Sequence, residues 1–138
     1  RLVGLLATAV AVGGLVELAT IRHWEGLQLI PWFVLAIVAV VGVVALDAPP
    51  LLTRLVGTIA ILGGALGVLQ HLLGNLALGP HLPEYADAWP SASVLEQWWL
   101  AASGAVGAAP PLAPGLVAIS GALLLISSIG SRSRAATA

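Results

Sequence analysis

The stretch LVGTIAILGGALGVLQHLLGNLAL, residues 55–78, decides the fold of this chain. It contains no Asp, Glu, Lys or Arg, and its main polar interruptions are Gln70, His71 and Asn75. A helix that crosses a bilayer needs about 20 consecutive and mainly apolar residues. The stretch therefore predicts a membrane-spanning helix.

The composition of the whole chain agrees with this prediction. Of the 138 residues, 59% are hydrophobic and only 8% are charged, whereas a soluble domain has about 25% charged residues. A chain this poor in charge cannot cover a water-facing surface, so we expect it to lie in a lipid bilayer. The formal net charge of −1 excludes a basic surface for nucleic acid, and the absence of cysteine excludes disulfides and thiolate metal sites.

Three further apolar runs extend the prediction to a four-helix protein. The expected spans are about 2–21, 27–46, 55–78 and 112–129, and a long outer loop, 79–111, joins the last two. We therefore expect an all-α integral membrane protein, a four-transmembrane-helix bundle that forms a single membrane domain over residues 1–138.

The distribution of arginine predicts the orientation. With both termini in the cytoplasm, the inner side collects Arg1, Arg54, Arg132 and Arg134, and the outer side holds only Arg22. Cytoplasmic loops carry an excess of Arg and Lys, so this N-in/C-in topology is favoured. The lack of lysine and the excess of Ala, Gly, Leu and Val are typical of a GC-rich genome, and we expect the bacterial inner (plasma) membrane.

The outer loop contains the signals of a short helix. Ser93 is followed three residues later by Glu96, which is the spacing of a capping box, and Gly104 can end a helix. These signals predict a helix over about 94–103 with Leu95 and Trp98 near one face. We expect it to lie at the membrane interface and not to cross the bilayer.

Small residues predict how the spans pack, because they let helix backbones approach closely in a membrane. One face of the third span collects Gly57, Ala60, Gly64, Gly67, His71, Gly74 and Asn75, and its Leu face should meet lipid. In the first span, Gly4, Ala7, Ala11 and Gly14 share one side.

Polar residues are expected to gather at the outer end of the bundle. Glu17 and His71 both lie within a few turns of that end, and a carboxylate facing lipid is costly. We expect Glu17, His71 and Asn75 to form a buried polar cluster that is roofed by residues 22–28 and 79–90. Gln28 is expected to cap the second span, where Pro31 suits the first helical turn.

The polar cluster has two interpretations. In one, Glu17, His23, Glu25, His71 and His81 supply metal ligands for copper, zinc or iron, or His71 and Asn75 hold a haem or chlorophyll. In the other, His71 makes a hydrogen bond that holds helices together, and the loop residues are solvated at the interface.

Three functions remain open from the sequence. The first is a small accessory subunit that contacts other membrane subunits, or a second copy of itself, in a larger complex. The second is a membrane metal-dependent enzyme that uses the polar cluster. The third is a proton-coupled transporter, because four spans with one carboxylate, Glu17, in the first resemble the small multidrug transporter family in outline. That family has short loops, whereas this chain has the long loop 79–111.

Overall fold

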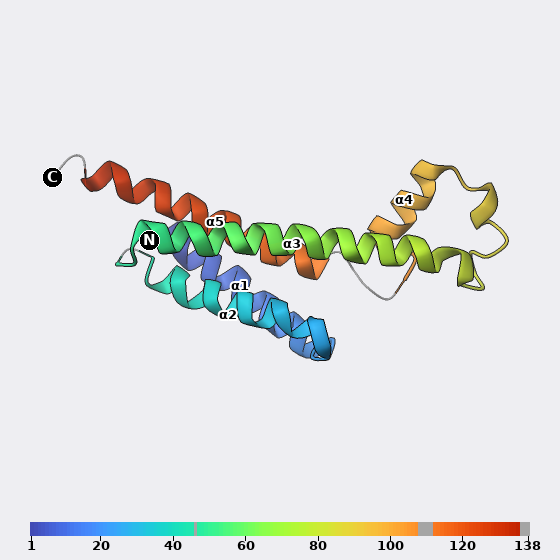
Figure 1. Cartoon of the computed structure of the whole chain (residues 1–138), viewed down its shortest axis with the longest axis horizontal. Helices are drawn as coiled ribbons and strands as arrows, with labels where there is room; N and C mark the ends of the chain where they lie inside the picture. Colours follow the sequence, from blue (N-terminus) through green and yellow to red (C-terminus); the bar gives the residue numbers. More distant parts are fainter. Residues whose placement is uncertain (46, 108–111, 136–138) are drawn as a thin grey trace. The chain divides into compact units, whose positions relative to one another are not determined.

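The computed structural model describes residues 1–45, 47–107 and 112–135, and every regular element in these ranges is helical (Figure 1). The α-helices are α1 (Leu2–Thr20), α2 (Ile30–Val43), α3 (Pro50–Leu78), α4 (Val94–Ser103) and α5 (Leu112–Ala135). Three short 3-10 turns accompany them: η1 (Gly26–Leu29), η2 (Gly79–His81) and η3 (Trp89–Ser91). The predicted all-α class is confirmed for the described residues.

Three helical segments within the described ranges are long and apolar enough to cross a membrane: Leu2–Thr20, Gly26–Val43 and Pro50–His81. They correspond to the first three expected spans. Helix α3 starts earlier than expected, at Pro50, because proline fits the first turn of a helix. The apolar part of α5, Ala113–Ile129, is a shorter apolar helix.

The chain divides into two compact units. The bundle unit contains Arg1–Ala65 and Ala113–Ala138, and the loop unit contains Leu66–Leu112. Helix α3 contributes its first part to the bundle unit and its last part to the loop unit. The single membrane domain expected over residues 1–138 stays a prediction.

Helices α1 and α2 form a hairpin held by very close backbone contact (Figure 1). All four small residues of the predicted α1 stripe, Gly4, Ala7, Ala11 and Gly14, are buried, which confirms that stripe. A Cβ atom built on Gly4 would lie 2.7 Å from the carbonyl oxygen of Gly42. The Thr8 hydroxyl donates a hydrogen bond of 2.9 Å to the carbonyl of Ala39. Small residues thus allow the approach, and one hydroxyl fixes the pairing of the two helices.

Helices α3 and α5 pack in the same way within the bundle unit. A Cβ on Gly57 would lie 2.8 Å from the carbonyl oxygen of Gly121, and one on Gly64 would lie 2.7 Å from that of Pro114. Ala60 between them is fully buried. The predicted packing role of these three residues of α3 is confirmed.

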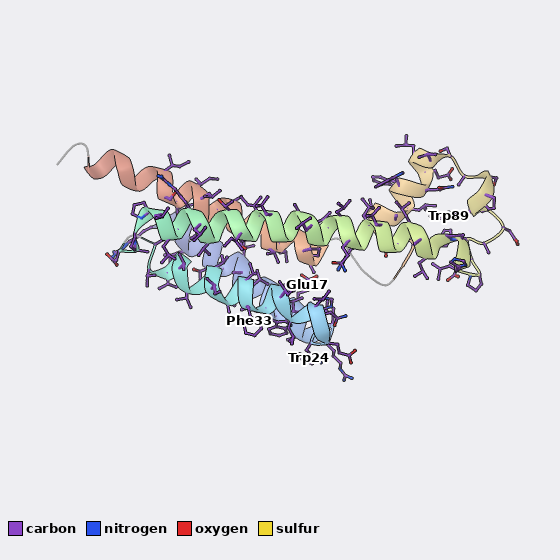
Figure 2. The ribbon with its side chains drawn as sticks, viewed as in Figure 1. Glu17, Trp24, Phe33 and Trp89 are labelled. Carbon is purple, nitrogen blue, oxygen red and sulfur yellow. The ribbon has the colours of Figure 1, made fainter. Side chains whose placement is uncertain are left out.

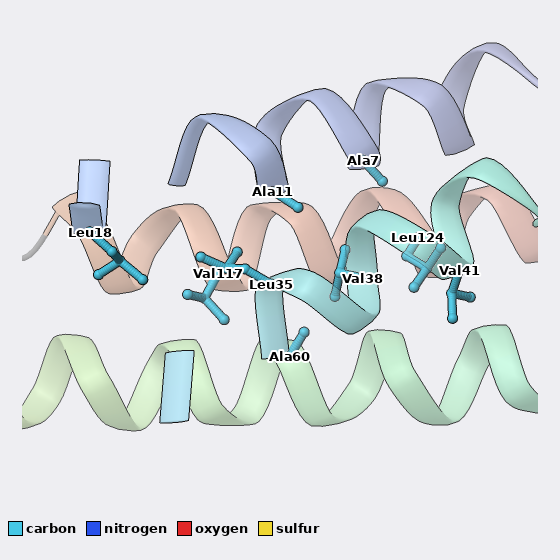
Figure 3. Close-up of a cluster of buried hydrophobic side chains, with 9 residues drawn as sticks. All are labelled: Ala7, Ala11, Leu18, Leu35, Val38, Val41, Ala60, Val117 and Leu124. Atoms are coloured by element: carbon cyan, nitrogen blue, oxygen red, sulfur yellow. The ribbon is translucent and has the colours of Figure 1, made fainter. Parts of the chain in front are cut away.

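The four helices of the bundle unit share one apolar core (Figure 3). Its buried members come from every one of these helices: Ala7, Ala11, Leu18, Leu35, Val38, Val41, Ala60, Val117 and Leu124. Most of the remaining large apolar side chains of α1 to α3 are exposed, including Leu62, Leu66, Leu69 and Leu73 on the predicted Leu face of α3. In a soluble protein such side chains are mostly buried, so their exposure here suits helices surrounded by lipid.

In the loop unit, helix α4 matches its prediction in both bounds and caps. The Ser93 hydroxyl accepts a hydrogen bond of 3.2 Å from the backbone N–H of Glu96, and Gly104 ends the helix with φ +77°. Two expectations for α3 are wrong in this unit. Gly74 is exposed rather than packed, and Leu72 and Leu76 on the Leu face are half-buried.

Candidate functional site

The residues expected to form one site belong to two different compact units of the chain. Glu17, His23 and Glu25 belong to the bundle unit, whereas His71, Asn75 and His81 belong to the loop unit. Asn75 is buried, with 2% of its surface exposed. Glu17, His23 and His71 are half-buried, and Glu25 and His81 are exposed. The joint cluster of Glu17, His71 and Asn75 stays a prediction.

The joint between α1 and α2 begins with a hydrogen-bonded cap at the C-terminal end of α1. The backbone N–H of His23 donates to the carbonyl of Leu18 at 2.9 Å, and that of Arg22 donates to Ala19 at 3.2 Å. This pair of bonds is the Schellman pattern, which requires a left-handed residue near the helix end. Arg22 takes that conformation with φ +53°, where glycine is the usual residue.

Two tryptophans cover this joint. Trp24 and Trp32 stack with ring centroids 5.9 Å apart and planes at 24°. The indole N–H of Trp32 donates a 2.6 Å hydrogen bond to the carbonyl of His23. Trp24 is exposed and lies at the tip of the hairpin (Figure 2). The backbone of His23 therefore serves to hold the turn together.

The acidic and amide groups of the joint also serve the local fold. Glu25 and Gln28 form a capping box around η1: the Glu25 side chain accepts from the backbone of Gln28, and the Gln28 side chain accepts from the N–H of Glu25 at 3.2 Å. Gln28 thus caps η1, just ahead of α2, and Pro31 lies in the first turn of α2 as expected. This engagement gives Glu25 a structural role at the joint.

Asn75 joins α3 to α4 in the loop unit. Its side-chain N–H donates a 3.0 Å hydrogen bond to the carbonyl of Ala101, which is fully buried. Its side-chain oxygen lies against Gly107, where any Cβ atom would overlap it, and Gly107 has φ +86°. Asn75 thus connects α3 to α4 and to the segment that follows α4.

A buried tryptophan supports the other side of the loop unit. Trp89 is labelled in Figure 2 and has 8% of its surface exposed. Its ring packs on Gly79, where a Cβ atom would overlap the ring. The side-chain N–H of Gln97 donates to the carbonyls of Trp89 at 3.0 Å and Ala92 at 3.2 Å. The Tyr85 hydroxyl donates to the carbonyl of Ala105 at 3.1 Å. The segment between α3 and α4 is therefore an ordered structure.

A metal centre receives no support from the side-chain arrangement. No group of three or more His, Asp or Glu side chains that could hold a metal ion occurs within the described parts of the chain. The proposed copper, zinc, iron, haem and chlorophyll ligands therefore stay predictions of the sequence.

One pocket opens in the bundle unit, away from the expected site. It has a volume of about 300 Å³ and is lined by residues from the start of α1, the end of α2 and α5: Arg1, Gly4, Leu5, Gly42, Val43, Ala45 and Ser127. No pattern in the sequence indicates this pocket, because the pocket depends on which helix ends meet in space. Its lining is mainly apolar, and among its described lining residues only Arg1 and Ser127 have a charge or a hydroxyl.

No protein-family model matches this chain, and neither a curated protein nor a solved structure matches it significantly.

Proposed function

We propose that this chain is a small integral-membrane subunit that works by helix–helix contact in a larger membrane assembly. In the proposed topology, α1, α2, α3 and α5 cross a bacterial inner membrane with both termini in the cytoplasm. The arrangement of two arginines supports this orientation. The Arg54 side chain donates to the Ser128 hydroxyl at 3.4 Å, and Arg1 shares a pocket with Ser127, so both arginines lie at one end of the bundle unit.

The observation that carries the proposal is a division among the small residues of the spans. One set, which includes Gly4, Gly57 and Gly64, packs against other helices of the same chain. A second set is open: outside the surrounding backbone of its own helix, no atom of the described residues lies within 4 Å of a Cβ built on Gly13 or Gly63. Small residues on an exposed helix face let another helix approach closely in a membrane. We assign this role to the faces around Gly13 and Gly63.

The use of polar side chains also favours a contact protein over an enzyme. Thr8, Trp32, Asn75, Tyr85 and Gln97 all donate to backbone carbonyls of their own chain. Every buried side-chain nitrogen or oxygen within the described parts has a partner. Polar groups used in this way stabilise a fold and do not converge on a substrate.

Photo-crosslinking in native membranes tests the proposal. A photoreactive side chain is introduced at Ile59, which lies four residues before Gly63 on the same helix face and is 51% exposed. The matched control is Leu69 on the Leu face, which is 47% exposed. We expect discrete protein adducts from position 59 and lipid adducts from position 69. Lipid adducts alone from both positions would contradict the proposal.

A further inference from the structure

We propose that helix α4 is a lipid-binding element that sits in the outer boundary of the bilayer, with Val94, Leu95, Trp98 and Trp99 in contact with lipid. The inference deepens the proposed function and rests on its topology, which places the loop unit on the outer side. It names the bilayer itself, and not a protein subunit, as the partner of this face.

The four side chains of this face are exposed. Val94, Leu95, Trp98 and Trp99 are 71%, 81%, 40% and 69% exposed. At 100° per residue they occupy one continuous arc of about 140° on the helix. None of them carries a charge, so they form an apolar face on a helix of ten residues.

The other two faces of α4 meet protein and water. Ala101 and Gln97 face the protein: Ala101 is fully buried beside Asn75, and Gln97 bonds to the carbonyl of Trp89. Glu96 and Ser103 are exposed and share a third, polar side of the helix. A helix with a protein side, an apolar side and a polar side fits a position beside a span at the membrane surface, where it meets protein, lipid and water at once.

The length of α3 indicates the depth of α4 relative to the bilayer. Helix α3 has 29 residues, which at 1.5 Å per residue corresponds to about 43 Å. The hydrocarbon core is only about 30 Å thick and takes about 20 residues. If Arg54 marks the inner boundary, the core ends near residue 74. Helix α4 is fastened to α3 at Asn75, by the bond to Ala101. That level is the headgroup boundary, which is the depth that tryptophan favours.

Lipid is the occupant that the connections and the charge of this segment favour. The chain on both sides of α4 continues into apolar helices, α3 and α5, so the bilayer surface is always within reach of this short helix. Residues 79–111 contain no Lys or Arg. The contact is therefore apolar and aromatic, and it requires neither anionic lipid nor low salt.

The absence of cysteine from the chain makes a direct test possible. Single-cysteine variants Leu95→Cys and Ser103→Cys, both at exposed positions of α4, are labelled with a nitroxide in the full chain. The chain is reconstituted in phosphatidylcholine vesicles. Collision with oxygen, which concentrates in lipid, is compared with collision with a neutral nickel chelate, which stays in water. We expect the ratio of oxygen to nickel collisions to be several-fold higher at position 95 than at position 103, and unchanged at high salt.

Two outcomes would overturn the inference. Equal and high access of the nickel chelate to both positions would place the apolar face in water. Protection of position 95 from both reagents would mean that protein, such as a second copy of the chain, covers the face. The same labels in a Gly63→Leu background separate this inference from the proposed assembly. A lipid contact at position 95 persists when helix–helix assembly is lost, so either claim can fail alone.

Discussion

Replacing Gly42 by alanine tests the close contact between α1 and α2. The added methyl group would lie 2.7 Å from the carbonyl oxygen of Gly4, 3.2 Å from the backbone nitrogen of Thr8, and against the Thr8 hydroxyl. Two of these three atoms belong to the backbone and cannot rotate away. The helices must separate locally, and the hydrogen bond from Thr8 to Ala39 must lengthen.

The expected cost follows from these contacts. Overpacking of a close interface costs about 1–3 kcal/mol, and a hydrogen bond between membrane helices contributes about 0.6 kcal/mol on average. Alanine offsets part of this, by up to about 1 kcal/mol, through its higher helix propensity. We expect Gly42→Ala to lower the free energy of unfolding by about 1–3 kcal/mol. Reversible unfolding in mixed micelles, followed by tryptophan fluorescence, measures the change.

Gly74→Ala is the matched control, because outside its own helix backbone no described atom lies within 4 Å of its Cβ, and its face has no assigned partner. The same glycine-to-alanine change there should be neutral or slightly stabilising. The double variant Gly4→Ala, Gly42→Ala should lose less than the sum of the two single losses, because the first methyl group already separates the helices. Equal stabilities for Gly42→Ala and Gly74→Ala would refute the close contact.

Three further outcomes follow from individual contacts. Arg22→Gly should raise the free energy of unfolding by about 1 kcal/mol in the same assay, because it relieves a left-handed non-glycine residue; a loss of stability would contradict this. Asn75→Leu should speed hydrogen exchange of the α4 amides about fivefold, because it removes a hydrogen bond to the α4 backbone that contributes ~1 kcal/mol. Unchanged exchange would refute the role of Asn75 in holding α4 to α3. Gly79→Ala should displace the Trp89 ring and shift tryptophan emission to longer wavelength. Gly74→Ala should leave the emission unchanged, because outside its own helix backbone no described atom lies within 4 Å of its Cβ. Equal spectra for both variants would contradict the packing of Trp89.

The elements that the sequence predicted well are those with local signals. The bounds of α4 follow from Ser93, Glu96 and Gly104, which act within one helical turn of the helix ends. The packing stripe of α1 follows from small residues at helical spacing, and such spacing is visible in any single helix. The general class follows from the scarcity of charge.

The features that escaped prediction depend on residues far apart in the sequence. The ring of Trp89 on Gly79, the bond from Thr8 to Ala39 and the contact of Arg54 with Ser128 each need the partner's position in space. Periodicity likewise placed Gly74 in the packing stripe, because it cannot show how far along α3 the neighbouring helices reach. The candidate site combined polar residues by their expected depth, and depth alone does not show which side chains meet.

The mass of the particle extracted from native membranes in lipid nanodiscs tests the central claim most directly. We expect the wild-type chain to occur in a particle larger than one chain. Gly63→Leu should release single, folded chains, since outside the backbone of its own helix no described atom of the chain lies within 4 Å of a Cβ at that position. The control Leu69→Val, on the Leu face, should keep the large particle. A wild-type particle with the mass of one chain, or one whose mass Gly63→Leu leaves unchanged, would contradict the account.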